Sequence, residues 1–397
     1  MAIKIFTSIL ILLSTYSFGQ SRKEQLEIAN SASVGLTDFY EEISFTDRSG
    51  YFIIPVIIGS RTYDYIFDTG GYNTATTDIL VKNQLPELMK VSVGSSNQIK
   101  SEIGLSKIPM LSVGNVPFIG VGVFNFDFDA AQVIKCYTNG GLLGKGVINQ
   151  AVWQVDYPNR IIRLADKVEK MPNLENSIKL KVELDKVFNP FIQVEIDGRK
   201  QKFMLDFGFG GFISLTEKTA NEYKFINTIE TNGEGTSGAN GVIKEAMFLS
   251  KLQTVNIGGQ RIDNQVAFYS KSNNYNLIGS ALAKHFIVTL NFKERELILT
   301  PLKQTPTESF KSFGIDININ EKDIYISRIY KGLSGDKMGV QLNDKVISVN
   351  GLTIDSLNLC ESLFRIRKAF DESDRLNIAL ERNKTSMEIE LQKTEIR

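Results

Sequence analysis

The sequence has very little histidine and cysteine for its length. Its 397 residues include one histidine, His285, and two cysteines, Cys136 and Cys360. Triad peptidases need a His base beside the nucleophile, and catalytic zinc sites generally take two or three His ligands. His285 enters an apolar strand and is predicted to be structural, so we expect no metal or other cofactor. Carboxylates remain as the groups that could run a hydrolysis. The cysteines fall in different predicted domains, so we interpret both as small buried hydrophobic residues rather than as a disulfide.

The sequence also lacks a net charge. Its 45 Lys and Arg residues balance 45 Asp and Glu residues, and 42% of the chain is hydrophobic. This composition is typical of a soluble globular protein and carries no electrostatic footprint for nucleic acid or for an anionic membrane surface. We therefore expect no nucleic acid partner. Beyond the N-terminus no stretch is long and apolar enough to cross a bilayer, so no stable membrane span is expected.

The first 20 residues differ from the rest of the chain. Lys4 precedes a nearly continuous apolar run from Ile5 to Leu13, and the small residues Ser17 and Gly19 follow on either side of Phe18. This pattern predicts a signal peptide over residues 1–20. The apolar run is shorter than the ~20 residues that a membrane-spanning helix needs. The protein is therefore expected to be exported, to the periplasm or to the medium.

An internal repeat organises residues 21–300. Asp68 and Asp206 lie 138 residues apart, each after two apolar strands joined by a Gly-containing turn, and each opens an Asp-x-Gly sequence. The register returns at Gly144 and Gly279, each at the end of an apolar-apolar-Gly element. Alternating apolar and polar residues, with Gly, Asn, Asp and Ser between short runs, predict antiparallel strands and hairpins. The sequence thus predicts one all-β lobe made twice.

Two polar segments mark the predicted domain boundaries. Residues 165–177 are polar and contain Pro172, and residues 301–311 contain two prolines, so both are typical of linkers. The predicted domains are a first lobe at 21–164, a second lobe at 178–300 and a C-terminal domain at 312–397.

The repeat gives the two aspartates their meaning. A single Asp after a strand usually caps backbone amides in a turn. Two lobes related by a pseudo-twofold bring equivalent loops together at the axis, as in a C2 dimer. Asp68 and Asp206 would then face each other and titrate as a coupled pair. The ionised member could take a proton from water while the protonated member polarises a scissile carbonyl.

These residues resemble a known family. Phe67-Asp68-Thr69-Gly70, with the downstream Gly-Leu-Leu-Gly ending at Gly144, resembles the corresponding elements of pepsin-like and retropepsin-like aspartic peptidases. The resemblance covers residues 50–300, and the two-lobed form is similar to bacterial exported aspartyl-protease proteins that carry a PDZ domain. It implies a mainly β fold with two duplicated acid-protease lobes plus a small α+β PDZ domain. It also implies that Asp68 and Asp206 are catalytic, with Thr69, Gly70 and Gly208 shaping their loops.

The second loop departs from the family pattern. In the family the Thr hydroxyl of each loop bonds to the opposite loop, and here the second motif is Asp206-Phe207-Gly208. Phe207 has no hydroxyl, so one half of this interlock is missing and the support of the pair is weakened. Family members also close a hairpin over the substrate. The Gly-rich segments 94–97 and 235–241 are candidate hairpin tips.

The C-terminal domain has its own motif. The sequence from Gly339 to Gly351, GVQLNDKVISVNG, resembles the core of PDZ domains, in which Asn-Gly turns between two strands. Residues 357–369 have the apolar spacing of the long PDZ helix. PDZ domains bind peptide C-termini by strand addition, with a loop of amides around the carboxylate. The resemblance places that loop at Phe313, Gly314 and Ile315, although Phe313 and Ile315 also fit simple core positions.

The sequence therefore favours an aspartic endopeptidase that acts on polypeptides and whose PDZ domain binds peptide C-termini. The alternative is a catalytically degenerate peptidase fold that serves as a peptide-binding scaffold, which Phe207 favours. Sugar hydrolysis by two carboxylates has only the Asp pairing in its favour.

Overall fold

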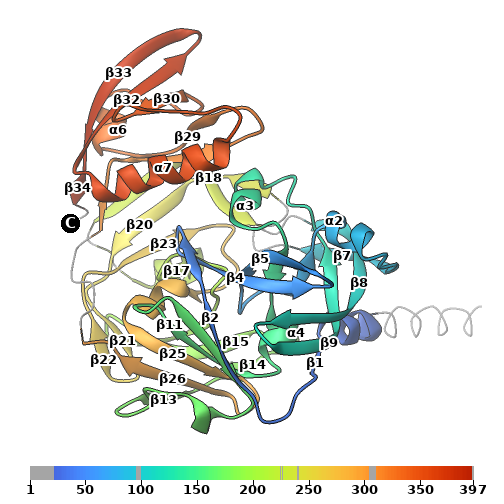
Figure 1. The fold of residues 1–397 in the computed structure, drawn as a ribbon. Helices are drawn as coiled ribbons and strands as arrows, with labels where there is room; N and C mark the ends of the chain where they lie inside the picture. The colour runs from blue at the N-terminus through green and yellow to red at the C-terminus, as the bar shows by residue number, and fades with distance from the viewer. Residues whose placement is uncertain are drawn as a thin grey trace, which may run out of the picture.

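The structure is a computed structural model that describes residues 22–94, 100–223, 225, 227–238, 241–303 and 310–395. The predicted signal peptide, residues 95–97 of one predicted hairpin tip and residues 239–240 of the other lie outside the described residues. The described chain is mainly β, with short helices between strands (Figure 1). Within it, no helix has both the length and the apolar character needed to cross a membrane.

The first half of the chain is built around a hairpin that ends at Asp68. β4 (Tyr51–Ile58) and β5 (Arg61–Phe67) pair in antiparallel register around Gly59. From Ile54 to Ile58 alternate residues of β4 are buried, as expected for a strand with one face on a core. The other strands of this half are β1 (Ser33–Val34), β2 (Tyr40–Ser44), β3 (Thr46–Arg48), β6 (Thr74–Ala75), β7 (Glu87–Gly94), β8 (Lys100–Val113), β9 (Val116–Asn125), β10 (Gly141–Leu143), β11 (Val152–Asp156) and β12 (Ile161–Ala165). Its helices include α2 (Thr77–Lys82), α3 (Gln132–Tyr137) and α4 (Lys145–Ile148), and residues 22–29 are also helical.

The second half repeats this order of elements. β15 (Pro190–Ile196) and β16 (Arg199–Leu205) form the hairpin that ends at Asp206, and β17 (Ile213–Thr216) with α5 (Glu217–Asn221) follows as β6 and α2 follow Asp68. The remaining elements are β13 (Ile178–Lys181), β14 (Glu183–Leu184), β18 (Thr228–Gly238), β19 (Gly241–Lys244), β20 (Met247–Lys251), β21 (Val255–Ile257), β22 (Gln260–Ile262), β23 (Val266–Ser270), β24 (Leu277–Ile278), the 3-10 helix η2 (Ser280–Lys284), β25 (Phe286–Asn291) and β26 (Glu296–Pro301).

A six-stranded sheet joins the two halves. Its order is β13-β26-β25-β11-β12-β2, and β11 of the first half pairs directly with β25 of the second. Residues 165–177, predicted as a linker, contain the 3-10 turn η1 (Val168–Lys170) and pack Met171 against Val152 and Ala165 of this sheet. The two halves thus share one continuous backbone hydrogen-bond network.

The C-terminal part, residues 311–395, is a small sheet with one long helix. α7 (Leu359–Glu372) covers the sheet, against a prediction of 357–369. Asn350 and Gly351 turn between β30 and β31 with φ of 49° and 77°, the left-handed geometry that an Asn-Gly hairpin turn adopts. The strands are β27 (Lys311–Ser312), β28 (Ile315–Ile319), β29 (Ile324–Tyr330), β30 (Lys345–Val349), β31 (Leu352–Thr353), β32 (Arg375–Arg382), β33 (Thr385–Gln392) and β34 (Thr394–Glu395), with α6 (Ser334–Lys337) between β29 and β30.

The C-terminal part is fastened to the rest of the chain at two places. Cys136 of α3 and Cys360 of α7 form a disulfide across a sequence separation of 224 residues. The expectation of two unpaired buried cysteines was wrong, because it assumed that residues in different predicted domains do not meet. At the second place β29 pairs in antiparallel register with β18 of the second half. Figure 1 shows α7 lying above α3 and β18.

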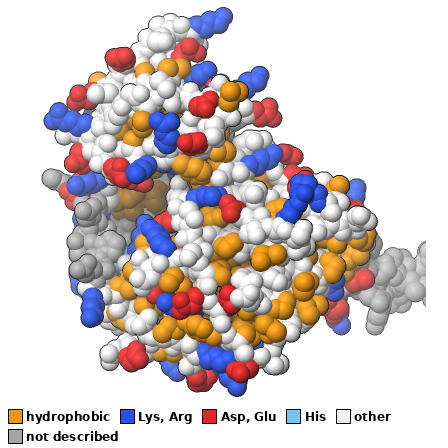
Figure 2. Space-filling model, viewed as in Figure 1, with side chains coloured by type: hydrophobic (Ala, Val, Ile, Leu, Met, Phe, Trp, Pro, Cys, Tyr) orange, Lys and Arg blue, Asp and Glu red, His pale blue; other side chains and the backbone are white. Residues whose placement is uncertain are grey.

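Charge is evenly distributed over the visible surface. Acidic and basic side chains are interspersed on the face shown in Figure 2, over the C-terminal part and over both halves. This agrees with the balanced composition of the sequence.

Candidate active site

Asp68 and Asp206 are placed by the same local structure in the two halves. β5 runs parallel to β10, and the Asp68 amide donates to the Leu143 carbonyl at 3.0 Å. β16 runs parallel to β24, and the Asp206 amide donates to the Ile278 carbonyl at 2.9 Å. Each aspartate is therefore fixed by the apolar-apolar-Gly element that recurs in its own half.

Gly144 and Gly279 end these elements because each loop backbone passes too close for a side chain. A Cβ at Gly144 would lie 2.6 Å from the Gly71 carbonyl oxygen, and one at Gly279 would lie 2.2 Å from that of Gly211. Contacts this short are not tolerated by backbone atoms, which have no freedom to move aside. Both glycines are therefore required by the approach of the Asp loop to the strand end.

The structure brings the two Asp loops together. A Cβ at Gly70 would lie 2.6 Å from Cγ of Asp206, and a Cβ at Gly208 would lie 2.6 Å from Cγ of Asp68. Each carboxyl group thus lies against the glycine of the opposite loop, so the two aspartates face each other across the loops. All four of these residues were predicted from the sequence as site residues.

The two carboxyl groups have different hydrogen-bond partners. Asp68 Oδ1 accepts from the amides of Gly70 at 2.9 Å and Gly71 at 2.8 Å, whereas Asp206 Oδ1 accepts from the Gly208 amide at 2.9 Å. Backbone donors stabilise the ionised form of a carboxyl group. Asp68 is therefore the better placed of the two to carry the negative charge.

The pKa directions agree with this asymmetry. Burial raises the pKa of Asp68, and the amides of Gly71 and Gly70 oppose that rise. Burial and then the neighbouring Asp68 charge raise the pKa of Asp206 well above its ordinary value. A pair coupled in this way holds one proton at intermediate pH, and the backbone amides favour Asp68 as its charged member.

Thr69 makes two hydrogen bonds from the first loop to the second. Its hydroxyl donates to the Leu205 carbonyl at 2.8 Å and accepts from the Phe207 amide at 3.0 Å. Thr69 is fully buried, so neither bond is exposed to competition from water. One hydroxyl therefore supplies both bonds to the second loop.

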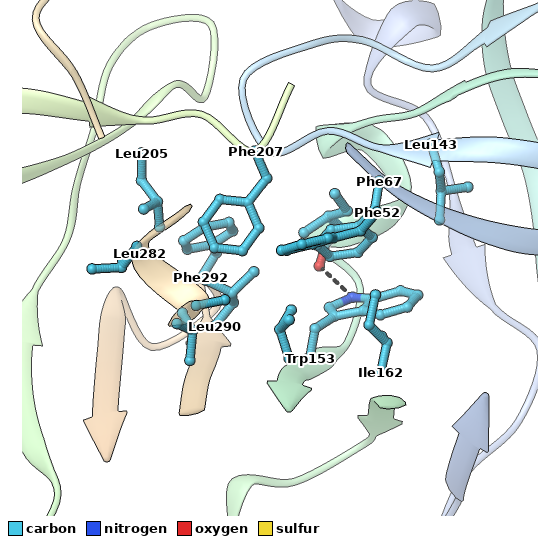
Figure 3. Close-up of a cluster of buried hydrophobic side chains, with 14 of the residues drawn as sticks. Phe52, Phe67, Leu143, Trp153, Ile162, Leu205, Phe207, Leu282, Leu290 and Phe292 are labelled. Carbon is cyan, nitrogen blue, oxygen red and sulfur yellow. Dashed lines mark hydrogen bonds between the residues drawn. The ribbon is translucent and has the colours of Figure 1, made fainter. Parts of the chain in front are cut away.

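Phe207 does not enter the space between the carboxyl groups. Its side chain is fully buried and points into the core below the loops, as Figure 3 shows. There it meets Phe52 edge to face with ring centroids 5.7 Å apart, and Phe67 at 6.4 Å. Phe52 and Phe67 belong to the first half, so this side chain links the halves by apolar packing where the family pattern has a hydroxyl.

Lys145 is a charged residue of this region that sequence reasoning did not identify. Only 2% of it is exposed, its Nζ donates to Asn189 Oδ1 at 2.7 Å, and it lies 4.0 Å from the Tyr72 ring centroid. Burial lowers its pKa to about 8, while Asp185, Asp68 and Asp206 oppose that shift. Its charge in turn lowers the pKa of both Asp68 and Asp206. The available signal was a lone Lys directly after Gly144 in an otherwise apolar run.

The residues predicted to bind a peptide carboxylate lie in the C-terminal part. Phe313 and Ile315 are each 2% exposed, and the Phe313 ring packs edge to face on Phe370. Gly314 has φ of +81°, and its amide donates to Ser312 Oγ at 2.9 Å. Phe313 and Ile315 therefore do occupy core positions, and the turn at Gly314 is left-handed.

The histidine predicted to be structural can also be placed. His285 is buried beside Phe212, and burial lowers its pKa to about 4, so the ring is neutral at neutral pH. Within the described residues, no group of three or more His, Cys, Asp or Glu side chains is arranged to hold a metal ion.

Comparison with known proteins adds little to this geometry. No protein-family model matches the chain, and no curated protein matches it. Among solved structures, the chain is similar to a retropepsin-like aspartic protease from Rickettsia conorii, at 23% identity over 31% of this chain and 89% of that chain, with a TM-score of 0.25. A score of this size establishes no shared fold.

Proposed function

We propose that this protein is an aspartic endopeptidase that hydrolyses peptide bonds in extended polypeptides with water activated between Asp68 and Asp206. The observation that carries the proposal is the apposition of the two carboxyl groups, each against the glycine of the opposite loop. Two carboxyls that share one proton suit general acid–base hydrolysis of an amide without a metal or a covalent intermediate.

The asymmetry of the pair supports a different role for each aspartate. Asp68, which accepts two backbone amides, is the base that takes a proton from the attacking water. Asp206, whose pKa is raised well above its ordinary value by burial and by Asp68, is the acid that donates to the scissile carbonyl oxygen. Water adds to the carbonyl carbon, and collapse of the resulting diol with protonation of the leaving nitrogen gives a carboxylic acid and an amine.

The position of the Phe207 ring supports a catalytic role for Asp68 and Asp206 over a purely structural one. A phenyl ring between the loops would separate the carboxyl groups and favour a peptide-binding scaffold. The ring instead lies in the core with Phe52 and Phe67 (Figure 3). Thr69 supplies the hydrogen bonds between the loops.

We further propose that residues 312–397 form a PDZ domain that binds peptide C-termini, and that residues 1–20 direct export. The Asn350-Gly351 turn, the helix α7 and the left-handed Gly314 support the first proposal. The Cys136–Cys360 disulfide supports the second, because disulfides persist in oxidising compartments and are rare in the cytosol.

The test is cleavage of a denatured protein by the wild type and by Asp68→Asn and Asp206→Asn, measured across pH. Each substitution keeps the shape of the side chain and removes its acid–base function. Each should reduce kcat/KM by roughly 10²–10⁴-fold. A hydroxyethylene transition-state mimic should inhibit the wild type. Unchanged cleavage by either variant, once shown to be folded, would overturn the proposal and leave the scaffold as the better reading.

The pH profile has a defined direction. Cleavage should fail at low pH as Asp68 becomes protonated and at high pH as Asp206 loses its proton. Since the pKa of both groups is raised, the active range should lie above that of an ordinary pair of carboxyl groups.

A further inference from the structure

One face of α7 is covered by another part of the same chain. Cys360, Phe364 and Arg367 are four and three residues apart, so they lie on one side of the helix. Cys360 is bonded to Cys136, the Phe364 ring lies 5.7 Å from the Tyr137 ring, and Arg367 donates to the Tyr137 hydroxyl. All three contacts are therefore made to α3 of the first half.

The helix α3 presents an apolar face to α7 and β28. Cys136 and Tyr137 follow Val133 by three and four residues, and all three side chains are buried. They belong to the same hydrophobic cluster as Ile315 and Ile317 of β28, and α3 contacts β28 directly. We call the area formed by β28 and by Cys360, Phe364 and Arg367 of α7 the β28–α7 surface.

The β28–α7 surface is where a peptide would bind to a PDZ domain. Such domains take an extended peptide as an added strand on the strand that follows the carboxylate loop, here β28 after Gly314. We infer that α3 is an internal occupant of this surface, held by the Cys136–Cys360 disulfide, and that a peptide gains access only after the disulfide is reduced. This inference rests on the proposed PDZ function of residues 312–397.

A second attachment allows α3 to leave without detaching the C-terminal part. β29 pairs with β18, and Glu234 of β18 accepts from Asn318 Nδ2 and from the Tyr325 hydroxyl, each at 2.6 Å. Arg328 Nε donates to the Glu234 carbonyl at 2.7 Å. These contacts involve neither cysteine, so reduction leaves them in place.

The chemical step is an exchange between thiols and a disulfide. A dithiol reductant attacks one sulfur of the Cys136–Cys360 bond, and its second thiol then closes the reductant's own disulfide. The bond between the two cysteine sulfurs breaks, each cysteine gains one electron and one proton, and the dithiol loses two of each. The product is a protein with two thiols in which only non-covalent contacts hold α3 against the β28–α7 surface.

The experiment measures peptide binding to the full-length chain by fluorescence anisotropy. The probe is a pool of fluorescein-labelled hexapeptides with a free C-terminal carboxylate and Val, Leu, Ile or Phe as the last residue, and the same pool with an amidated C-terminus is the control. An Asp68→Asn background prevents cleavage of the probe. Binding is compared between the oxidised chain, the chain reduced with dithiothreitol, and Cys136→Ser with and without dithiothreitol.

We expect the reduced chain and Cys136→Ser to bind the free-carboxylate pool at least about tenfold more tightly than the oxidised chain. Dithiothreitol should not change the binding of Cys136→Ser. Equal binding by oxidised and reduced chains would overturn the inference and leave the PDZ proposal standing. Binding by neither form would overturn both. Reduction of the chain with both cysteines intact keeps the test valid even if Cys136→Ser does not fold.

Discussion

The two Asp loops share a backbone arrangement and differ in how they are held. The first loop contributes the Thr69 hydroxyl, which makes two buried hydrogen bonds to the second loop. The second loop contributes the Phe207 ring, which packs on Phe52 and Phe67 of the first half. The boundary between the two halves is therefore crossed by hydrogen bonds from the first loop and by an apolar side chain from the second loop.

The difference shows that a missing hydroxyl need not leave a loop unsupported. A hydrogen bond fixes the position of a few atoms, whereas burial of an aromatic ring gains more free energy with less directional control. In this protein the hydrogen bonds act on the backbone beside the carboxyl groups, and the ring acts one layer below them. Substitutions of Thr69 and of Phe207 should therefore disturb the two Asp loops in different ways.

The largest expected effect is that of Phe207→Ala. Removal of a fully buried Phe side chain leaves a cavity and typically lowers the free energy of unfolding by about 3–5 kcal/mol. Urea denaturation of the full-length chain measures this loss. Phe188→Ala is the matched control because Phe188 is 44% exposed, and it should change stability far less. Equal losses for the two variants would show that Phe207 does not support the boundary.

A somewhat smaller effect is expected for Thr69→Val. The substitution keeps the shape of the side chain and leaves the Phe207 amide and the Leu205 carbonyl without their partner, at a cost of about 2–4 kcal/mol in unfolding free energy. Thr69 lies between Asp68 and Gly70, whose amide donates to the Asp68 carboxyl group. Loss of the interlock should therefore shift that carboxyl group and lower kcat, while KM changes little. Thr69→Ser retains the hydroxyl and should keep most of both quantities. A Thr69→Val variant with wild-type kcat would show that the interlock does not position the pair.

The smallest effect, and the sharpest test of the charge balance, comes from Lys145→Met. The Lys145 charge lowers the pKa of both Asp68 and Asp206, so its removal should raise both pKa values. Both limbs of the kcat/KM profile should then move to higher pH. Lys145→Arg keeps the charge and should keep the profile. A shift of one limb alone, or to lower pH, would contradict the assignment.

Much of the site geometry could be predicted because it follows from local sequence. Each Asp ends an apolar strand, and a glycine downstream ends a second one, so the repeat itself indicates which loops meet. The Asn350-Gly351 turn and the apolar spacing of α7 were equally local. These features depend on backbone geometry that a short sequence specifies.

The rest depends on residues distant in the chain. The Cys136–Cys360 contact spans 224 residues, and no spacing rule links a helix of the first half to one near the C-terminus. The direction of the Phe207 ring was equally hidden, because its identity alone fits both a wedge between the loops and a core position. From the sequence alone Lys145 would be expected to be exposed, as most lysines are. In the folded protein it is buried beside Asn189 and Tyr72.

The pairing of β11 with β25 has a consequence for dilution. The two halves that carry Asp68 and Asp206 share one sheet within a single chain, through pairs such as Trp153 with Leu290. A pair assembled from two separate chains falls apart as the protein becomes scarce, because its stability depends on protomer concentration. Here the two halves belong to one chain, so the effective concentration of one half at the other does not change on dilution. The carboxyl pair should therefore remain assembled on dilution, and the proposed cleavage activity should stay proportional to the amount of protein.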